Sequence, residues 1–119
     1  MMKTKSIFRS VLCAAVLLST GAHADISCSG TLSGVLMYAN GNVMIQGSWR
    51  NDWTTICNTQ TGWGGIDTST CVAWYGAAVK TSQSHIAVGV YYSGDAYTCA
   101  NLPTYASTPP PVYFLTFVN

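Results

Sequence analysis

The chain has 119 residues, with five Lys or Arg, four Asp or Glu and a formal net charge of +1. Three of the five basic residues lie in residues 1–24, so residues 25–119 keep two basic and four acidic side chains, a balance of 2 − 4 = −2. A surface with so few cations cannot displace counterions from nucleic-acid phosphates or form a polybasic membrane patch. We therefore expect neither nucleic acid nor a membrane surface as partner.

Residues 1–24 have the organisation of a secretory signal peptide. Three basic residues precede an apolar run at residues 11–18, and Ala22-His23-Ala24 forms an A-x-A cleavage motif. The run is too short to cross a bilayer, which takes about 20 apolar residues in a helix. We expect cleavage near Ala24, a single domain formed by residues 25–119, and a secreted or periplasmic protein.

The first half of the mature chain predicts three strands. Asn40-Gly41 separates two strand-like runs, residues 32–39 and 42–49, and Asn-Gly favours a type I′ hairpin turn. Gly34 in the first run predicts a bend or bulge. A polar turn then leads to residues 53–58, which are rich in β-branched and aromatic side chains typical of a strand.

A loop rich in Gly and Thr, residues 59–65, precedes the only substantial predicted helix. Asp67-Thr68-Ser69 is typical of a helix start, because these side chains accept hydrogen bonds from first-turn amides. Apolar residues then recur at positions 71, 74, 75, 78 and 79, which is helical spacing. We predict a helix over Ser69–Gln83.

The second half predicts further strands. Residues 86–92 alternate in the manner of a strand, and residues 96–99 favour a short one. A stretch with four prolines, ending at Pro111, predicts an extended connector, and residues 112–118 a final strand.

This order of elements predicts the fold class. A three-strand meander, a helix and two more strands is the order of an OB barrel. We predict a mainly β protein with one α-helix, folded as an OB-like five-stranded barrel. A small β-sandwich is the alternative, although such folds do not ordinarily place one helix between their strands.

Four cysteines remain in the mature chain, and an even number in an exported domain predicts two disulfides with three possible pairings. We prefer Cys57–Cys71, because this bond would hold the 59–65 loop and stabilise the fold by roughly 3 kcal/mol. Cys28–Cys99 is then the second bond. No Cys-x-x-Cys pair is present and the mature chain has one histidine, so we predict no metal and no other cofactor.

Catalytic residues are scarce. The chain has no glutamate, and His85 is the only mature histidine. A nucleophile-elbow motif is missing, and the four aspartates form no evident pair for glycoside hydrolysis. A small hydrolase that uses His85 is therefore the last of our hypotheses, and we predict that the protein is not an enzyme.

Aromatic residues are abundant: four Trp, seven Tyr and two of the three Phe lie in the mature chain, among many Asn, Ser and Thr. Aromatic rings can stack on the apolar faces of sugars, but they also fill small cores. Trp63 lies in a Gly-rich loop with little sequence around it to bury an indole. It is the best candidate for an exposed anchor to a glycan or a protein.

Four short motifs carry a family resemblance: Ser33-Gly34-Val35, Ile56-Cys57, Cys71 at the helix start and Val90-Tyr91-Tyr92. Together with the order of elements, they resemble the B subunits of bacterial AB-type toxins, in the subtilase-cytotoxin and pertussis-like group. The resemblance covers roughly residues 30–95.

Such B subunits are exported OB-fold domains that form a pentameric ring and bind cell-surface glycans. The resemblance implies that Ser33, Tyr91 and Tyr92 lie near a glycan pocket. It also implies a homo-oligomeric ring and an exported catalytic subunit as partners. Residues 97–111 have no counterpart in the family.

Two functional hypotheses follow. The first is a secreted module that recognises cell-surface or extracellular glycans and resembles a toxin B subunit. The second is a secreted protein-binding factor or inhibitor that acts through the 59–65 loop.

Overall fold

The computed structural model describes residues 25–117, so the predicted signal peptide lies outside the described residues. This part of the chain is mainly β with one helix. Its elements are β1 (Ile26–Gly30), β2 (Leu32–Met37), β3 (Asn42–Gly47), β4 (Trp53–Asn58), α1 (Thr68–Ser84), β5 (Val88–Tyr92) and β6 (Tyr113–Thr116).

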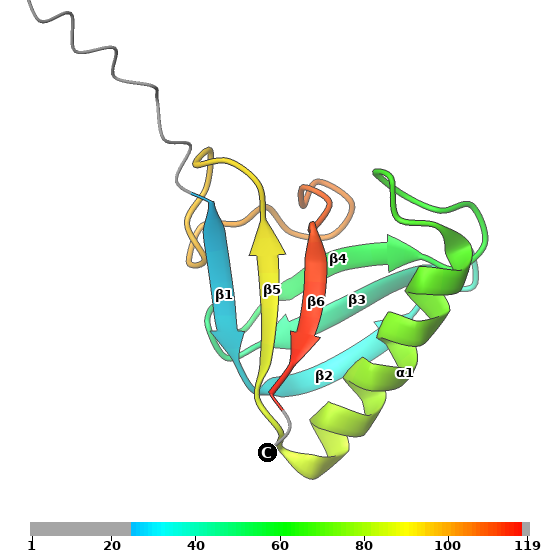
Figure 1. The fold of residues 1–119 in the computed structure, drawn as a ribbon, viewed down its shortest axis with the longest axis horizontal. Coiled ribbons are helices and arrows are strands. Elements are labelled where there is room, and N and C mark those ends of the chain that lie inside the picture. The colour runs from blue at the N-terminus through cyan, green and yellow to red at the C-terminus, as the bar shows by residue number, and fades with distance from the viewer. Residues whose placement is uncertain (1–24, 118–119) are drawn as a thin grey trace, which may run out of the picture.

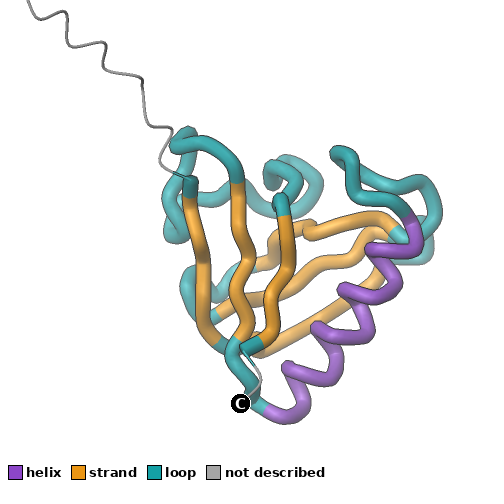
Figure 2. Tube along the Cα trace, in the orientation of Figure 1, coloured by secondary structure: helices purple, strands orange, loops and turns teal. Residues whose placement is uncertain are grey.

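The strands form two antiparallel sheets of three strands each. Sheet A has the order β1-β5-β6, and sheet B has the order β2-β3-β4. Thr31 alone separates β1 from β2, so one stretch of chain enters both sheets. Figures 1 and 2 show the strands of sheet A running across those of sheet B, with α1 along one side. The two sheets do not close into one barrel, and the predicted five-stranded barrel is not confirmed.

The core lies between the two sheets and the helix. Alternate residues of β5, namely Val88, Val90 and Tyr92, are at most 1% exposed, and Val43 and Ile45 of β3 are fully buried. Burying a side chain of this size contributes about 1.5–3 kcal/mol. Because side chains alternate along a strand, Gly89 and Tyr91 lie on the other side of β5, where Tyr91 is half-buried and Gly89 is buried beside the Phe117 ring.

The predicted hairpin between β2 and β3 forms, but its turn differs from the predicted type I′. Tyr38 accepts a hydrogen bond from the Gly41 amide at 2.9 Å, and Gly41 has φ 90°. Asn40 is not among the described residues with positive φ, which a type I′ turn requires. Residues 39–41 therefore form a three-residue connection with Gly at the positive-φ position. The predicted irregularity near Gly34 is confirmed by a register shift between Leu32 and Gly34.

The helix is confirmed and extends one residue beyond the prediction at each end. Asp67 caps its start, and the Asp67 carboxylate accepts a hydrogen bond from the Thr70 amide at 2.7 Å. His85 ends it in the left-handed conformation, with φ 53° and its amide donating to the Thr81 carbonyl. His85 is therefore an exposed residue that caps the end of the helix.

The prediction missed β1 and placed one strand wrongly. β1 has the sequence ISCSG, whose small polar residues have low strand preference, and it is a strand because it pairs along its length with β5. Residues 96–99 form no strand. Cys99 is instead joined to Cys28 of β1, so the disulfide rather than a ladder of hydrogen bonds fixes this segment.

Both disulfides form in the preferred pairing, Cys28–Cys99 and Cys57–Cys71. The first ties sheet A to the segment after β5, and the second ties the end of β4 to the first turn of α1. Two such bonds indicate an oxidising compartment, extracellular or periplasmic. Within residues 25–117, α1 is the only helix, and it is not long and apolar enough to cross a membrane.

Candidate functional site

The four residues predicted to contact a ligand occupy three separate elements. Ser33 is exposed on β2, where its hydroxyl donates to the Gln46 carbonyl at 3.2 Å. Tyr91 and Tyr92 are neighbours on β5, and Trp63 lies in the loop before α1. The surface hollow beside Trp63 is lined by residues 61–67 alone, so it includes none of the other three.

Tyr92 is a core residue, and the prediction that it contacts a ligand is not supported by its position. Its side chain is 1% exposed and belongs to the hydrophobic core. Burial raises the pKa of the Tyr92 phenol, although the nearby Thr54 and Arg50 act in the opposite direction. Successive side chains of a strand point to opposite sides of the sheet, so only one of the two consecutive tyrosines in β5 can face solvent.

Trp63 is less exposed than its Gly-rich sequence suggests. It is half-buried against the core, and its backbone forms a pair of 3.0 Å hydrogen bonds with Ile66. The loop also packs on the proline-rich segment, where a Cβ added at Gly64 would lie 2.1 Å from the Pro110 ring. The hollow that remains has a volume of about 430 Å³.

Tyr91 and Tyr113 form a stacked pair on the solvent side of sheet A. The two residues are direct partners across β5 and β6, and their ring centroids lie 4.7 Å apart with planes inclined by 5°. Tyr91 is half-buried and Tyr113 is 44% exposed. Each ring covers one face of the other, so the faces open to a ligand are the outward ones.

Asp25 holds the hydroxyl of Tyr91 in place. Its carboxylate accepts a hydrogen bond from the Tyr91 hydroxyl and another, at 3.1 Å, from the Gly94 amide. The hydrogen bond to Asp25, then desolvation, then the charges of Asp25 and Tyr113 raise the pKa of Tyr91 to about 12. The phenol is therefore neutral and oriented at physiological pH.

The rest of this surface is small or apolar. Ser27 of β1 pairs with Tyr91, so Ser27, Tyr91 and Tyr113 form one row across sheet A. Leu115 is 44% exposed in the next row, and the Phe117 ring lies 3.2 Å from the position of a Cβ on Gly89. We call the surface formed by Asp25, Ser27, Tyr91, Tyr113 and Leu115 the tyrosine face.

Sequence reasoning did not identify Tyr113. Alternation in residues 112–118 could have placed Tyr113, Leu115 and Phe117 on one side of a strand. The partnership with Tyr91, however, depends on the register between two strands 20 residues apart. No local pattern specifies that register.

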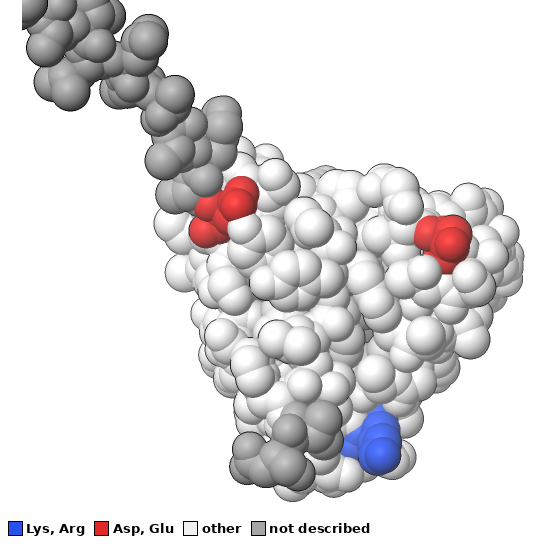
Figure 3. All heavy atoms as spheres, in the orientation of Figure 1, with Lys and Arg blue, Asp and Glu red and all other residues white. Residues whose placement is uncertain are grey.

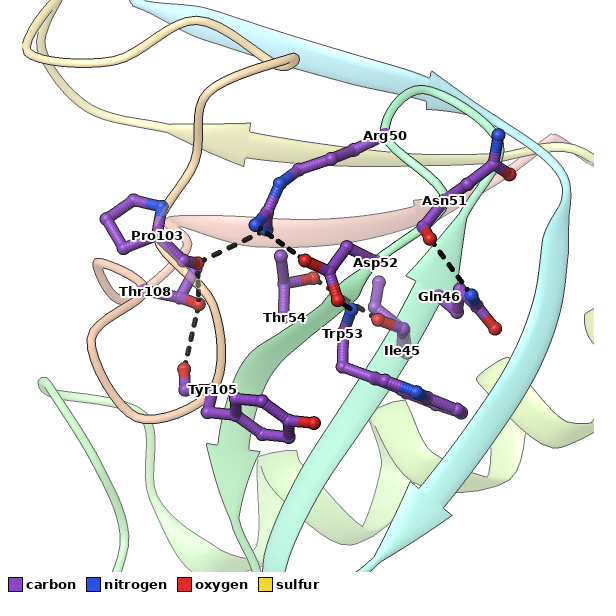
Figure 4. Close-up of polar contacts among 10 residues, drawn as sticks. All are labelled: Ile45, Gln46, Arg50, Asn51, Asp52, Trp53, Thr54, Pro103, Tyr105 and Thr108. Atoms are coloured by element: carbon purple, nitrogen blue, oxygen red, sulfur yellow. Dashed lines mark hydrogen bonds and ion pairs between the residues drawn. The ribbon is translucent and has the colours of Figure 1, made fainter.

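A second polar cluster joins the 97–111 segment to sheet B (Figure 4). The Arg50 guanidinium contacts the Asp52 carboxylate at 3.1 Å and the Pro103 carbonyl at 3.4 Å, and the Arg50 side chain is 12% exposed. The Tyr105 amide donates to the Trp53 carbonyl at 3.1 Å, at the edge of β4. Since these groups satisfy one another, the cluster holds the segment on the sheet and leaves Arg50 little capacity for a ligand.

Residues 25–117 contain no group of three or more His, Cys, Asp or Glu side chains that could hold a metal ion. The tyrosine face brings together two aromatic rings, a carboxylate and hydroxyl groups. No protein-family model, curated protein or solved structure matches this chain.

Proposed function

We propose that this chain is an exported, non-enzymatic module that binds glycans through the tyrosine face. The observation that carries the proposal is the stacked, solvent-facing pair of Tyr91 and Tyr113 beside the Asp25 carboxylate. An aromatic ring offers a flat apolar surface to the C–H face of a pyranose. Carboxylate, phenol and serine groups offer the acceptors and donors that sugar hydroxyls need.

The topology supports the toxin B-subunit-like version of this proposal. Sheet A continues through Thr31 into sheet B, so the strand order runs β6-β5-β1, then β2-β3-β4. This order is compatible with an open OB-like barrel. A homo-oligomeric ring and an exported catalytic subunit are then the proposed partners, and a pentameric mass in light scattering is the corresponding measurement.

A glycan array with purified mature protein tests the binding site. We expect Tyr113→Ala to lower binding about tenfold or more, since removing one exposed stacking ring removes about 1.4 kcal/mol or more of binding free energy. Tyr38→Ala is the matched control, because Tyr38 is 46% exposed on the β2–β3 hairpin, outside sheet A.

Equal losses in the two variants would contradict the tyrosine face as the site. A far-UV circular dichroism spectrum of each variant shows whether the fold is retained, so that loss of binding can be separated from unfolding.

The second candidate function is protein binding through the 59–65 loop. The hollow of about 430 Å³ beside half-exposed Trp63 favours it. A blank glycan array with folded protein would make this loop the leading site.

A further inference from the structure

We infer that the glycan site continues from the tyrosine face to the Phe117 ring and binds two consecutive sugar units, so that its ligand is an oligosaccharide rather than a single sugar. This inference rests on the proposed function and concerns the chemical class of the ligand. Its basis is a second row of residues across sheet A, next to the row formed by Ser27, Tyr91 and Tyr113.

Phe117 lies on the same side of sheet A as the tyrosine pair. Side chains alternate along a strand, so residues 113, 115 and 117 share one side of β6 and its continuation. The Phe117 amide donates to the Ala87 carbonyl at 2.9 Å, which extends the pairing of β6 with the β5 side of the sheet beyond Thr116. Phe117 is 48% exposed, so this aromatic residue is available to a ligand.

Gly89 makes room for the Phe117 ring. A Cβ at residue 89 would lie 3.2 Å and 3.3 Å from two atoms of that ring, so the ring reaches from β6 over the middle of β5. Gly89 itself is buried, whereas about half of Phe117 stays exposed. A second aromatic ring is therefore held beside the tyrosine pair, with part of its surface open to solvent.

The two rows have the same composition. Ser29 of β1 pairs with Gly89, under the Phe117 ring, just as Ser27 pairs with Tyr91, and both serines are exposed. Each row thus has an aromatic ring and a serine hydroxyl. The rows are two residues apart along β5, a distance of about 7 Å at about 3.4 Å per residue. This spacing is similar to that of neighbouring rings in an oligosaccharide, so two consecutive units can each contact one row.

The surface of β6 that joins the two rings is apolar. Residues 112–117 contain no Lys, Arg, Asp or Glu, and Leu115, between Tyr113 and Phe117, is 44% exposed. Figure 3 shows uncharged atoms along the visible side of β6. A surface of this kind suits the C–H faces of sugar rings, while the serines of β1 can exchange hydrogen bonds with sugar hydroxyls.

The test is a glycan array printed with galactose, glucose, mannose and N-acetylglucosamine, each as a monosaccharide, a disaccharide and a trisaccharide. In the series that binds, we expect the disaccharide to bind about tenfold more tightly than the monosaccharide, and the trisaccharide to add little. Phe117→Ala should remove most of the gain from the second unit and leave binding of the monosaccharide unchanged, because the tyrosine pair is retained.

Two further variants separate a contact with sugar from a change in the fold. Phe117→Tyr keeps an aromatic ring and should retain the gain from the second unit. Gly89→Ala keeps Phe117 but places a methyl group against its ring, so it should reduce the gain. Circular dichroism spectra show whether each variant is folded.

Monosaccharides that bind as tightly as their disaccharides would overturn the inference and leave the proposed function standing. Equal losses for both sugars in folded Phe117→Ala would do the same. Folded wild-type protein that binds no glycan would overturn both the inference and the proposed function.

Discussion

The two sheets of this protein are built in contrasting ways. Sheet B takes three consecutive strands from residues 32–58, and the Cys57–Cys71 disulfide that fastens it to α1 spans 14 residues. Sheet A takes its strands from residues 26–30, 88–92 and 113–116, and the Cys28–Cys99 disulfide spans 71 residues. Sheet B therefore depends on local sequence, whereas sheet A, which carries the tyrosine face, depends on closing long loops.

Removing each disulfide should have the largest effect on stability and should affect the two sheets differently. We expect the Cys28→Ala, Cys99→Ala double variant to lose about 4.4 kcal/mol of unfolding free energy and the Cys57→Ala, Cys71→Ala variant about 3 kcal/mol. The first loss is larger because a bond that closes a longer loop removes more conformational entropy from the unfolded chain. Urea denaturation monitored by tryptophan fluorescence measures both losses. A larger loss for the 14-residue bond would show that sheet B, not sheet A, is the half that needs covalent support.

The same contrast explains which parts of the fold the sequence could predict. Trp53–Asn58 and the start of α1 were predicted to within a residue, because strand preference and the Asp67 cap act over a few positions. β1 was missed, since ISCSG has little strand preference and becomes a strand only by pairing with β5. The turn at Asn40-Gly41 was placed correctly but typed wrongly, because a three-residue and a two-residue connection share the same Asn-Gly signal.

The candidate site was predicted only in part for the same reason. Tyr91 was singled out, but nothing local distinguishes it from the buried Tyr92, and the choice is made by the register of β5 against β1. Trp63 looked unprotected because Pro110, which packs against its loop, lies 47 residues further along the chain. Residues that meet only after long loops close are not visible to arguments from neighbouring sequence.

A smaller effect is expected at the start of α1, within the half that depends on local sequence. Asp67→Ala should lower the urea midpoint by less than either disulfide removal, because it removes the side-chain acceptor for the Thr70 amide. Asp67→Asn keeps an acceptor and should retain most of the stability. If both variants behaved alike, the charge rather than the cap would be responsible.

The cap should also depend on pH. Hydrogen bonds from the Thr70 side chain, the Thr70 amide and Ser69 lower the pKa of Asp67 below its ordinary value of 3.8. A carboxyl with a lowered folded-state pKa adds stability above the unfolded-state pKa and loses it as the pH falls through the folded-state value. The difference in urea midpoint between wild type and Asp67→Ala should therefore be constant near neutrality and shrink below about pH 4.

The smallest expected effect is a change in the pKa of Tyr91, in the tyrosine face of sheet A. The pKa of Tyr91 is raised to about 12, with the hydrogen bond to Asp25 as the main cause. Asp25→Asn should move this pKa back toward 10, because an amide holds the neutral phenol less strongly than a carboxylate does. Subtracting the ultraviolet titration of Tyr91→Phe from each parent curve isolates this tyrosine from the other six.

The response to Asp25→Asn separates the hydrogen bond to Asp25 from desolvation, because both of them raise the pKa of Tyr91. Because the folded-state pKa is raised, the hydrogen bond contributes stability below pH 10, and that contribution is lost as the pH rises through about 12. Asp67→Asn, which removes a charge at the start of α1, should leave the Tyr91 titration in place. An unchanged titration in Asp25→Asn would instead mean that desolvation holds the phenol neutral, and that the hydrogen bond to Asp25 is not what orients the Tyr91 ring in the tyrosine face.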